Sequence, residues 1–335
     1  MYKKNTKNMN KNLNPLFIYH NLKPKIMKTR RSLLSVIAAI GILSSFALTS
    51  CESDDENKME KPKDIVEVAL STADFSILVS ALQKADLVNA LKADGPFTVF
   101  APTNAAFNQL FSDLGVSGIS ELSKEQLTPI LLYHVLGTKV MSTGLTSGYV
   151  TTLSTGAGKK SVSLKVDASS LMLNGDVGIT SADISASNGV IHVINKVLLP
   201  PTVVDVALDN SNFSILVSAL VKAELVETLK GAGPFTVFAP TNDAFNALFT
   251  QLGVSGISDL SKEALTPILL DHVVSGNVRS TDLSTGTVST LNNTININIS
   301  AGVKINTNIS VVLADVQGTN GVVHVIDKVI VTASK

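Results

Sequence analysis

Tryptophan is absent from this sequence of 335 residues, cysteine occurs once, and aromatic residues make up only 5% of the chain. A single cysteine excludes an internal framework of disulfide bonds. Charged residues are also scarce, at 16% against 45% hydrophobic residues. This balance excludes a disordered chain, because such chains are rich in charge and poor in apolar side chains. The length is sufficient for two or three domains of ordinary size.

Acidic residues are absent from residues 1–50, which carry nine lysine and arginine residues. The whole chain has 27 basic and 27 acidic residues, so residues 51–335 hold 18 basic against 27 acidic residues, a net charge of −9. Binding to nucleic acid requires clustered lysine and arginine to neutralise phosphates. We therefore expect no nucleic-acid partner.

Residues 1–50 have the plan of a secretory signal peptide. A short basic stretch at residues 27–31 precedes an uncharged, mostly apolar run at residues 32–49, and small residues follow. A transmembrane anchor is the alternative, because the run is near the lower limit for a membrane span. Met27 is a second plausible start, so residues 1–26 are either a mis-assigned start or an extended basic region.

The only cysteine, Cys51, directly follows Leu48-Thr49-Ser50, and this motif resembles the lipobox of bacterial lipoproteins. The resemblance implies that the signal is cut before Cys51 and that lipid is attached to its thiol and to the new N-terminus. Several acyl chains are needed for stable anchoring, because each buried methylene contributes only about 0.8 kcal/mol. The predicted location is the outer membrane of a Gram-negative bacterium, with the lipid anchor as the contact to the membrane.

Residues 51–61 form a polar, acidic stretch that we expect to be a flexible linker. Within it, Ser53-Asp54-Asp55-Glu56 resembles the acidic signal that sends some lipoproteins to the outer face of the outer membrane. That resemblance implies an outward-facing protein. A solvated spacer without an address is the alternative.

The rest of the chain consists of two tandem copies of one sequence repeat. Residues 95–110 (GPFTVFAPTNAAFNQL) agree with residues 233–248 at fourteen of sixteen positions, at an offset of 138. Residues 188–194 align with residues 320–326 at an offset of 132, so the second copy lacks six residues in between. All ten phenylalanines after Cys51 pair at the 138 offset, which indicates shared core positions. The prolines Pro200 and Pro201 end the first copy, so the predicted domains are 62–200 and 201–335.

The pattern within each copy changes from helical to strand-like, which favours an α+β fold. We expect helices at residues 64–70 and 75–91, a helix carrying Phe107, and a helix that begins at a capping box of Ser123 and Gln126. Expected strands lie at residues 96–101, 149–153, 161–166 and 189–198, with a hairpin turn at Asn174-Gly175. In the second copy, Ile295, Ile297 and Ile299 are expected on one buried face.

Three motifs recur in order in both copies: GPFTVFAPTNAAF, LLYHVL (residues 131–136) and NGVIHVINKVLLP (residues 188–200) in the first. In this order and spacing they resemble the fasciclin domain. The resemblance implies two tandem domains, each with a helical N-terminal part packed on an antiparallel β-sandwich or wedge. It also implies an extracellular adhesion module that is not an enzyme and has no cofactor.

Four of the five histidines pair between the copies, as His134 with His272 and His192 with His324. Neither an HExxH motif nor another clustered ligand spacing accompanies them in the sequence, so we expect no metal site. His192 and His324 alternate with apolar residues, which predicts buried histidines bonded to the backbone. The hydrolase signature G-x-S-x-G is also missing, since the repeated loop Gly-Val-Ser-Gly at residues 115–118 is one residue too short.

The candidate binding residues are Tyr133, His134, Asp271 and His272. The resemblance implies this role, because a Tyr-His pair has been tied to integrin binding in animal fasciclin domains. Tyr133-His134 fits that pair and Asp271-His272 does not. Because both copies keep only the histidine, the preferred interpretation is a structural role for both pairs.

The leading hypothesis for function is a non-enzymatic surface lipoprotein that binds an extracellular protein or glycan in adhesion. The alternative is an accessory protein that captures a polysaccharide or other polymer for an outer-membrane uptake system. Glycan platforms usually offer exposed aromatic side chains, which are scarce here. The oligomeric state does not follow from the sequence.

Overall fold

The computed structural model describes residues 61–331. The predicted signal peptide, Cys51 and the acidic stretch at residues 53–56 lie outside the described residues. We call residues 61–200 the first domain and residues 201–331 the second domain; all of them belong to one compact unit of the chain.

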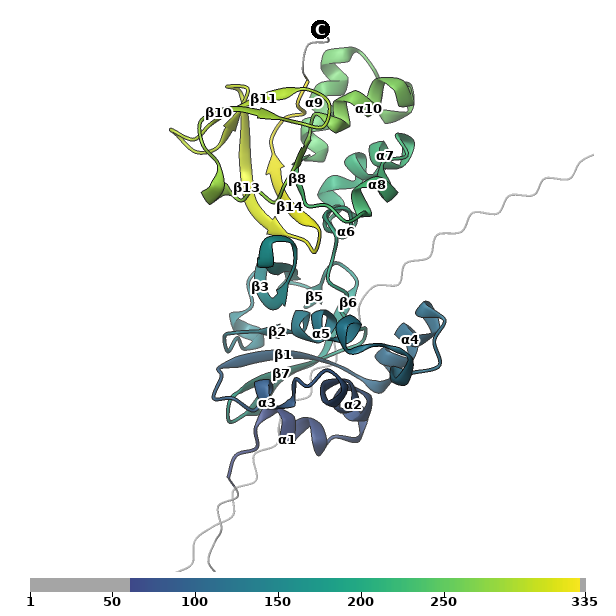
Figure 1. The fold of residues 1–335 in the computed structure, drawn as a ribbon, viewed down its shortest axis with the longest axis vertical. Coiled ribbons are helices and arrows are strands. Elements are labelled where there is room, and N and C mark those ends of the chain that lie inside the picture. The colour runs from purple at the N-terminus through teal and green to yellow at the C-terminus, as the bar shows by residue number, and fades with distance from the viewer. Residues whose placement is uncertain (1–60, 332–335) are drawn as a thin grey trace, which may run out of the picture. The chain divides into compact units, whose positions relative to one another are not determined.

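Helices dominate the first half of each domain (Figure 1). The helices of the first domain are α1 (Ile65–Leu70), α2 (Ser76–Lys84), α3 (Val88–Leu91), α4 (Asn104–Leu114) and α5 (Lys124–Tyr133). Those of the second domain are α6 (Val203–Leu208), α7 (Ser214–Lys222), α8 (Val226–Lys230), α9 (Asn242–Leu252) and α10 (Lys262–Leu270). No helix within residues 61–331 has the length and apolar character to cross a membrane.

Side chains that cap the helices explain where several of them begin. Ser123 Oγ accepts a hydrogen bond from the N–H of Gln126, and Gln126 Oε1 accepts one from the N–H of Ser123, which is the predicted capping box. In the second domain, Ser261 Oγ accepts from the N–H of Ala264, but the alanine side chain has no acceptor for the N–H of Ser261. The expected helix at residues 75–91 is divided instead, because the backbone of Asp86 turns to a φ of 56° between α2 and α3.

Each domain contains one sheet of seven strands. In the first domain the strand order is β2-β1-β7-β6-β5-β4-β3, and in the second it is β10-β11-β12-β13-β14-β8-β9. The strands of the first domain are β1 (Phe97–Pro102), β2 (Val135–Leu136), β3 (Gly148–Thr155), β4 (Ser161–Asp167), β5 (Met172–Leu173), β6 (Val177–Ala186) and β7 (Gly189–Ile194). Those of the second are β8 (Phe235–Pro240), β9 (Val273–Ser275), β10 (Gly286–Ser289), β11 (Thr294–Asn298), β12 (Lys304–Ile305), β13 (Ile309–Gln317) and β14 (Gly321–Ile326).

The sheets are mixed, whereas the sequence predicted an antiparallel β-sandwich or wedge. β1 pairs with β7 in parallel, and β8 pairs with β14 in the same way. Parallel neighbours require a long crossover connection, which the intervening helices and strands supply. A second difference concerns Ile299, which is 43% exposed because β11 ends one residue earlier, at Asn298.

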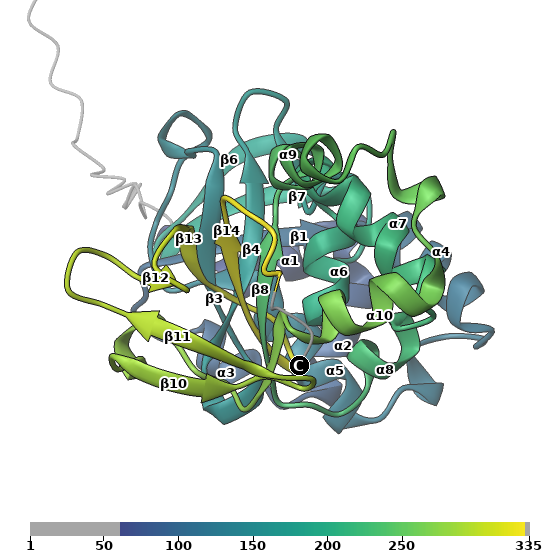
Figure 2. The same cartoon turned by 90° about the horizontal axis from the view of Figure 1, so that it is seen from above.

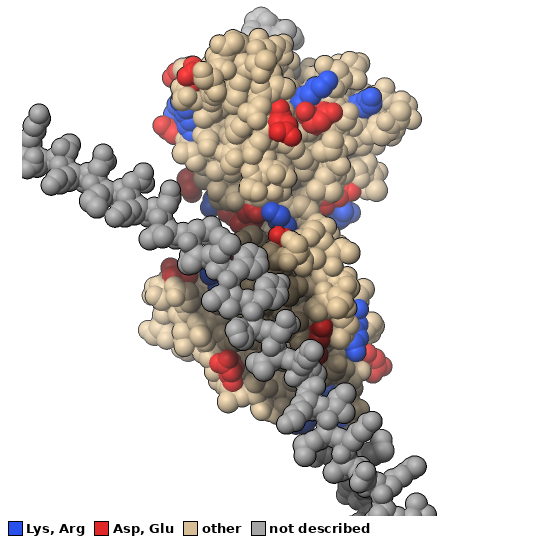
Figure 3. Space-filling view, turned by 180° about the vertical axis from the view of Figure 1, so that it is seen from behind, with Lys and Arg blue, Asp and Glu red and all other residues tan. Residues whose placement is uncertain are grey.

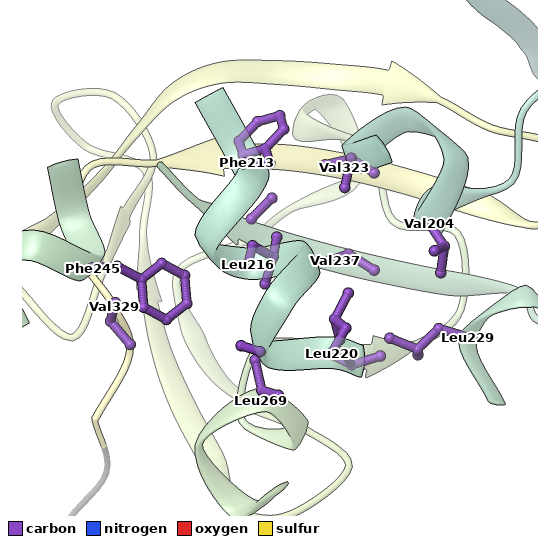
Figure 4. Close-up of a cluster of buried hydrophobic side chains, with 14 of the residues drawn as sticks. Val204, Phe213, Leu216, Leu220, Leu229, Val237, Phe245, Leu269, Val323 and Val329 are labelled. Atoms are coloured by element: carbon purple, nitrogen blue, oxygen red, sulfur yellow. The ribbon is translucent and has the colours of Figure 1, made fainter. Parts of the chain in front are cut away.

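Two clusters of buried side chains stabilise each domain. The larger cluster lies between the helices and one face of the sheet, and most of the helices, such as α4, α7 and α10, lie to the right of the strands in Figure 2. Figure 4 shows this cluster in the second domain, where Leu216 and Leu220 of α7 point toward Val237 of β8. The smaller cluster lies on the other face, where the first domain buries Phe100 and Leu164 and where β3 contacts β2. The sheet therefore curves round a second core, and this gives the predicted wedge.

Candidate functional site

Tyr133, the last residue of α5, is fully buried. Its Oη donates a hydrogen bond to the carbonyl of Ser163 in β4, at 3.0 Å, and accepts one from Asn174 Nδ2, also at 3.0 Å. Burial raises the pKa of Tyr133 well above its usual value. The tyrosine thus ties the end of a helix to a strand and to the hairpin turn at Asn174.

His134, the next residue, is 2% exposed and bridges two distant backbone groups. Its Nδ1 lies 2.8 Å from the carbonyl oxygen of Ile130, and its Nε2 accepts a hydrogen bond from the N–H of Leu198 at 2.9 Å. A carbonyl accepts only from a protonated nitrogen, so this imidazole is the neutral Nδ1–H tautomer. Burial lowers the pKa of His134 to about 4. The side chain joins the end of α5 to the segment that closes the first domain.

His272 makes the same bridge in the second domain. Its Nδ1 lies 2.7 Å from the carbonyl oxygen of Ile268, and its Nε2 accepts from the N–H of Ile330 at 2.8 Å. Burial lowers the pKa of His272 to about 4 as well. The matched geometry shows that the histidine serves the same structural purpose in both copies.

Asp271 replaces the tyrosine in the second domain and is also buried. Its Oδ1 accepts a hydrogen bond from Asn292 Nδ2 at 3.0 Å, in the turn between β10 and β11. The Asp271 carboxylate therefore connects the end of α10 to the strands by accepting a hydrogen bond. In the first domain, the Tyr133 hydroxyl makes the corresponding connection. All four candidate binding residues are internal, and direct contact between them and a ligand stays a prediction that would require them to become exposed.

Each domain also contains a cluster of serine, aspartate and histidine that the sequence did not predict. In the first domain, Ser142 Oγ donates to Asp183 Oδ2 at 2.6 Å, and the N–H of Asp183 donates to His192 Nδ1 at 3.2 Å. His192 Nε2 lies 2.9 Å from the carbonyl oxygen of Val140, so it carries the proton. The hydrogen bond from Ser142 lowers the pKa of Asp183.

The second domain repeats this cluster with Ser280, Asp315 and His324, at nearly the same distances. Ser280 matches Ser142 at the 138 offset, and the other two match at 132. The signal available in the sequence was therefore a serine, an aspartate and a histidine that all recur at the repeat offsets.

Serine, aspartate and histidine are also the residue types of a hydrolase triad, but their geometry here does not allow that chemistry. A triad needs an imidazole nitrogen that can take the proton of the serine hydroxyl. Both nitrogens of His192 are engaged with backbone groups, and the Ser142 hydroxyl donates to the carboxylate instead. The cluster holds the bulge of β6, where Asp183 has a φ of 66°.

A groove of about 800 Å³ lies where α4 and the turn at residues 174–177 of the first domain meet the start of the second. Its lining includes Asp176, Asp205 and Asp209, and burial raises the pKa of Asp209 to about 7 with the other two carboxylates acting in the same direction. Within residues 61–331, no group of three histidine, cysteine, aspartate or glutamate side chains could hold a metal ion.

Comparison with known proteins identifies the fold. The Fasciclin domain profile matches residues 73–200 and again residues 211–332. The chain belongs to the fasciclin-domain family. Protein sll1483 of Synechocystis is 39% identical over 184 residues, which cover 52% of this chain and 99% of that protein.

This chain also matches parts of longer proteins. Transforming growth factor-beta-induced protein ig-h3 of Sus scrofa is 32% identical over 284 residues, which cover 81% of this chain but 38% of that protein. Among solved structures, a fasciclin domain pair from the insect cell adhesion molecule Fasciclin I aligns with a TM-score of 0.44 and 18% identity. That alignment covers 76% of this chain and 95% of the insect pair.

Proposed function

We propose that this protein is a non-enzymatic binding module of the cell surface, anchored through lipid on Cys51 in the outer membrane and recognising an extracellular protein or glycan. The observation that carries the proposal is the pair of fasciclin domains at residues 73–200 and 211–332. Fasciclin domains are associated with cell adhesion and extracellular binding among homologues. The lipobox-like sequence before Cys51 supports the anchoring, and the acidic residues after it support an outward-facing position.

The chemistry of the described residues supports binding over catalysis. The four paired histidines place both ring nitrogens on backbone groups, so these imidazoles are engaged in holding the fold. On the face shown in Figure 3, charged side chains of both signs are sparse and most of the surface is uncharged. Such a surface differs from the basic stripe of a nucleic-acid binder.

The experiment is a capture assay with the full-length chain, tagged at its C-terminus, against envelopes of the native host. The control is the double variant Leu131→Ala and Leu269→Ala, which removes one matched buried leucine from each domain and so destabilises both folds by about 2–5 kcal/mol each. We expect the wild-type chain to enrich a partner that the double variant does not.

Two pretreatments of the envelopes identify the partner class. Protease treatment abolishes capture of a protein, whereas periodate oxidation abolishes capture of a glycan. Equal enrichment by the wild-type chain and the double variant, or no enrichment by either, would contradict the proposal.

A further inference from the structure

The hairpin that joins β3 and β4 is longer than its counterpart in the second domain. Eleven residues (152–162) separate the paired Thr151 and Ser163, whereas four residues (290–293) separate the paired Ser289 and Thr294. The hairpin is therefore seven residues longer in the first copy, and the second copy regains one residue between Ile297 and Ile305, which leaves the difference of six. We call residues 156–160, beyond the last paired residues Thr155 and Ser161, the hairpin tip.

The hairpin tip bonds to the second domain through its backbone. The N–H of Ala157 donates to the carbonyl of Thr319 at 2.8 Å, and Asn277 Nδ2 donates to the carbonyl of Ala157 at 3.1 Å. Below the tip, Ser163 Oγ accepts from the N–H of Gln317 at 3.0 Å in a buried position. Three hydrogen bonds thus connect one hairpin to the end of β13, to the turn that follows it and to the loop after β9.

Gly156 shows how closely the two backbones approach. A Cβ atom on Gly156 would lie 2.4 Å from the carbonyl oxygen of Gly318 and 2.8 Å from the Cα of Thr319. Its φ of −111° is open to other residue types, so the conformation of the hairpin itself does not require glycine. The glycine is required because the second domain lies against it.

Both sides of this contact are specific to their own copy. Asn277 and Gln317, which meet the hairpin, correspond to Lys139 and Ser185 in the first domain at offsets of 138 and 132. The second domain in turn lacks a hairpin of this length. The first domain therefore supplies the hairpin tip and the second domain supplies the surface that receives it. The second domain has no equivalent tip that could make the same contact with another domain.

Further contacts lie beside the tip. Tyr149 of β3 packs against the main hydrophobic cluster of the second domain, and Lys165 Nζ of β4 donates to the backbone carbonyl of Asp209 at 2.8 Å. Strands β3 and β4 thus make both apolar contacts and hydrogen bonds with the second domain.

We propose that the hairpin tip is a docking element for the second domain, which couples the unfolding of the two domains and fixes them as a single binding unit. Its receptor is the surface formed by Asn277, Gln317 and Thr319. The proposal does not depend on what the protein binds.

The test measures whether destabilising one domain affects the other. The chain has no tryptophan, so Leu252→Trp, at a half-exposed position on α9, reports on the second domain alone. Leu82→Ala, in the buried core of the first domain, removes contacts within that domain only. In the full-length chain with its native tip, we expect Leu82→Ala to lower the urea midpoint of the second-domain probe.

The same comparison is repeated in two tip variants. Gly156→Ala introduces the clash with Gly318, and Ala157→Pro removes the N–H that donates to Thr319 at a position where the first turn of a helix tolerates proline. In both variants we expect the second-domain midpoint to be lowered already and to be unaffected by Leu82→Ala. Lys159→Asn, at an exposed residue of the same tip, is the control and should preserve the coupling.

Two results would overturn the proposal. The first is a second-domain midpoint that does not respond to Leu82→Ala when the tip is native. The second is a response of equal size in the native chain, in Gly156→Ala and in Ala157→Pro. Because Ala157→Pro acts without adding a side chain at Gly156, it decides the question even if Gly156→Ala does not fold.

Discussion

The bridging histidines allow a sharp comparison between the two domains. Replacing His134 by alanine removes the acceptor of the Leu198 N–H and the donor to the Ile130 carbonyl. A buried N–H left without a partner costs about 1–3 kcal/mol. The missing ring adds a cavity, at about 24 cal/mol for each Å³ that does not collapse. We therefore expect His134→Ala to destabilise the first domain by about 3 kcal/mol.

His272→Ala is the matched perturbation of the second domain, because its two bonds, at 2.7 and 2.8 Å, repeat those of His134. If the histidines are structural, the two variants destabilise their own domains by similar amounts. If Tyr133-His134 is instead a binding pair, only the first-domain variant should affect binding, since Asp271 stands in place of the tyrosine in the second.

The assay uses the absence of tryptophan. Leu114→Trp and Leu252→Trp lie at matched positions with nearly equal exposure, 50% and 49%, and give one fluorescent probe for each domain. Urea titrations with each probe are run in the Ala157→Pro background, where the proposed coupling through the hairpin tip is removed, so that each probe reports the stability of its own domain. The capture assay is run on the same histidine variants with the native tip. An unchanged midpoint for His134→Ala together with lost capture would refute the structural interpretation.

The remaining predictions concern pH and anchoring. Burial lowers the folded pKa of His134 to about 4, whereas its unfolded value is about 6.5. Between these two pH values the unfolded state binds more protons than the folded state, so acidification from pH 7.5 to pH 5 should lower the stability of the first domain by about 2 kcal/mol. His134→Ala should abolish this dependence on pH in urea titrations. In the second domain the raised pKa of Asp209 opposes the loss, because its folded state binds more protons as pH falls toward 4, whereas burial lowers the pKa of His324 as well as that of His272 and adds to the loss. Asp209→Asn should therefore steepen the loss of second-domain stability on acidification, and an unchanged slope would count against this. Cys51→Ser should abolish labelling by a palmitate analogue, since only a thiol is alkylated in lipoprotein maturation, and equal label in the variant would exclude the predicted anchor. Alanine at Asp54, Asp55 and Glu56 should protect the protein from protease added to intact cells, whereas unchanged cleavage would reduce the acidic stretch to a spacer.

Features that depend on neighbours in the sequence were predictable. The capping box of Ser123 and Gln126 lies within one turn of helix, and the hairpin turn at Asn174-Gly175 combines φ values of 47° and 85° that asparagine and glycine tolerate. The repeat offsets also predicted core positions, because a phenylalanine at both positions of a pair indicates a packing site that the two copies share. Burial of His192 and His324 followed from their alternation with apolar residues in β7 and β14.

Features that depend on distant partners were not predictable. The parallel pairing of β1 with β7 joins Phe97 to Gly189, and no local pattern specifies the direction of such a pair. The acceptor role of His134 depends on Leu198, 64 residues away. The purpose of the longer hairpin in the first copy became visible only with Thr319 placed beside Ala157. Ile299 was misassigned because alternation continued in the sequence after the strand had ended.

The central claim is that the paired histidines are internal bonds of the fold and not ligand contacts. The most direct measurement is the protonation of each imidazole nitrogen by NMR of the histidine-labelled chain between pH 8 and pH 5. The bonds to Ile130 and Ile268 predict the Nδ1–H tautomer for His134 and His272, and the bonds to Val140 and Val278 predict the Nε2–H tautomer for His192 and His324. Burial also predicts that His134 and His272 stay neutral throughout this range. An Nε2–H tautomer at either of these two residues, or titration of either near pH 6.5, would contradict the account.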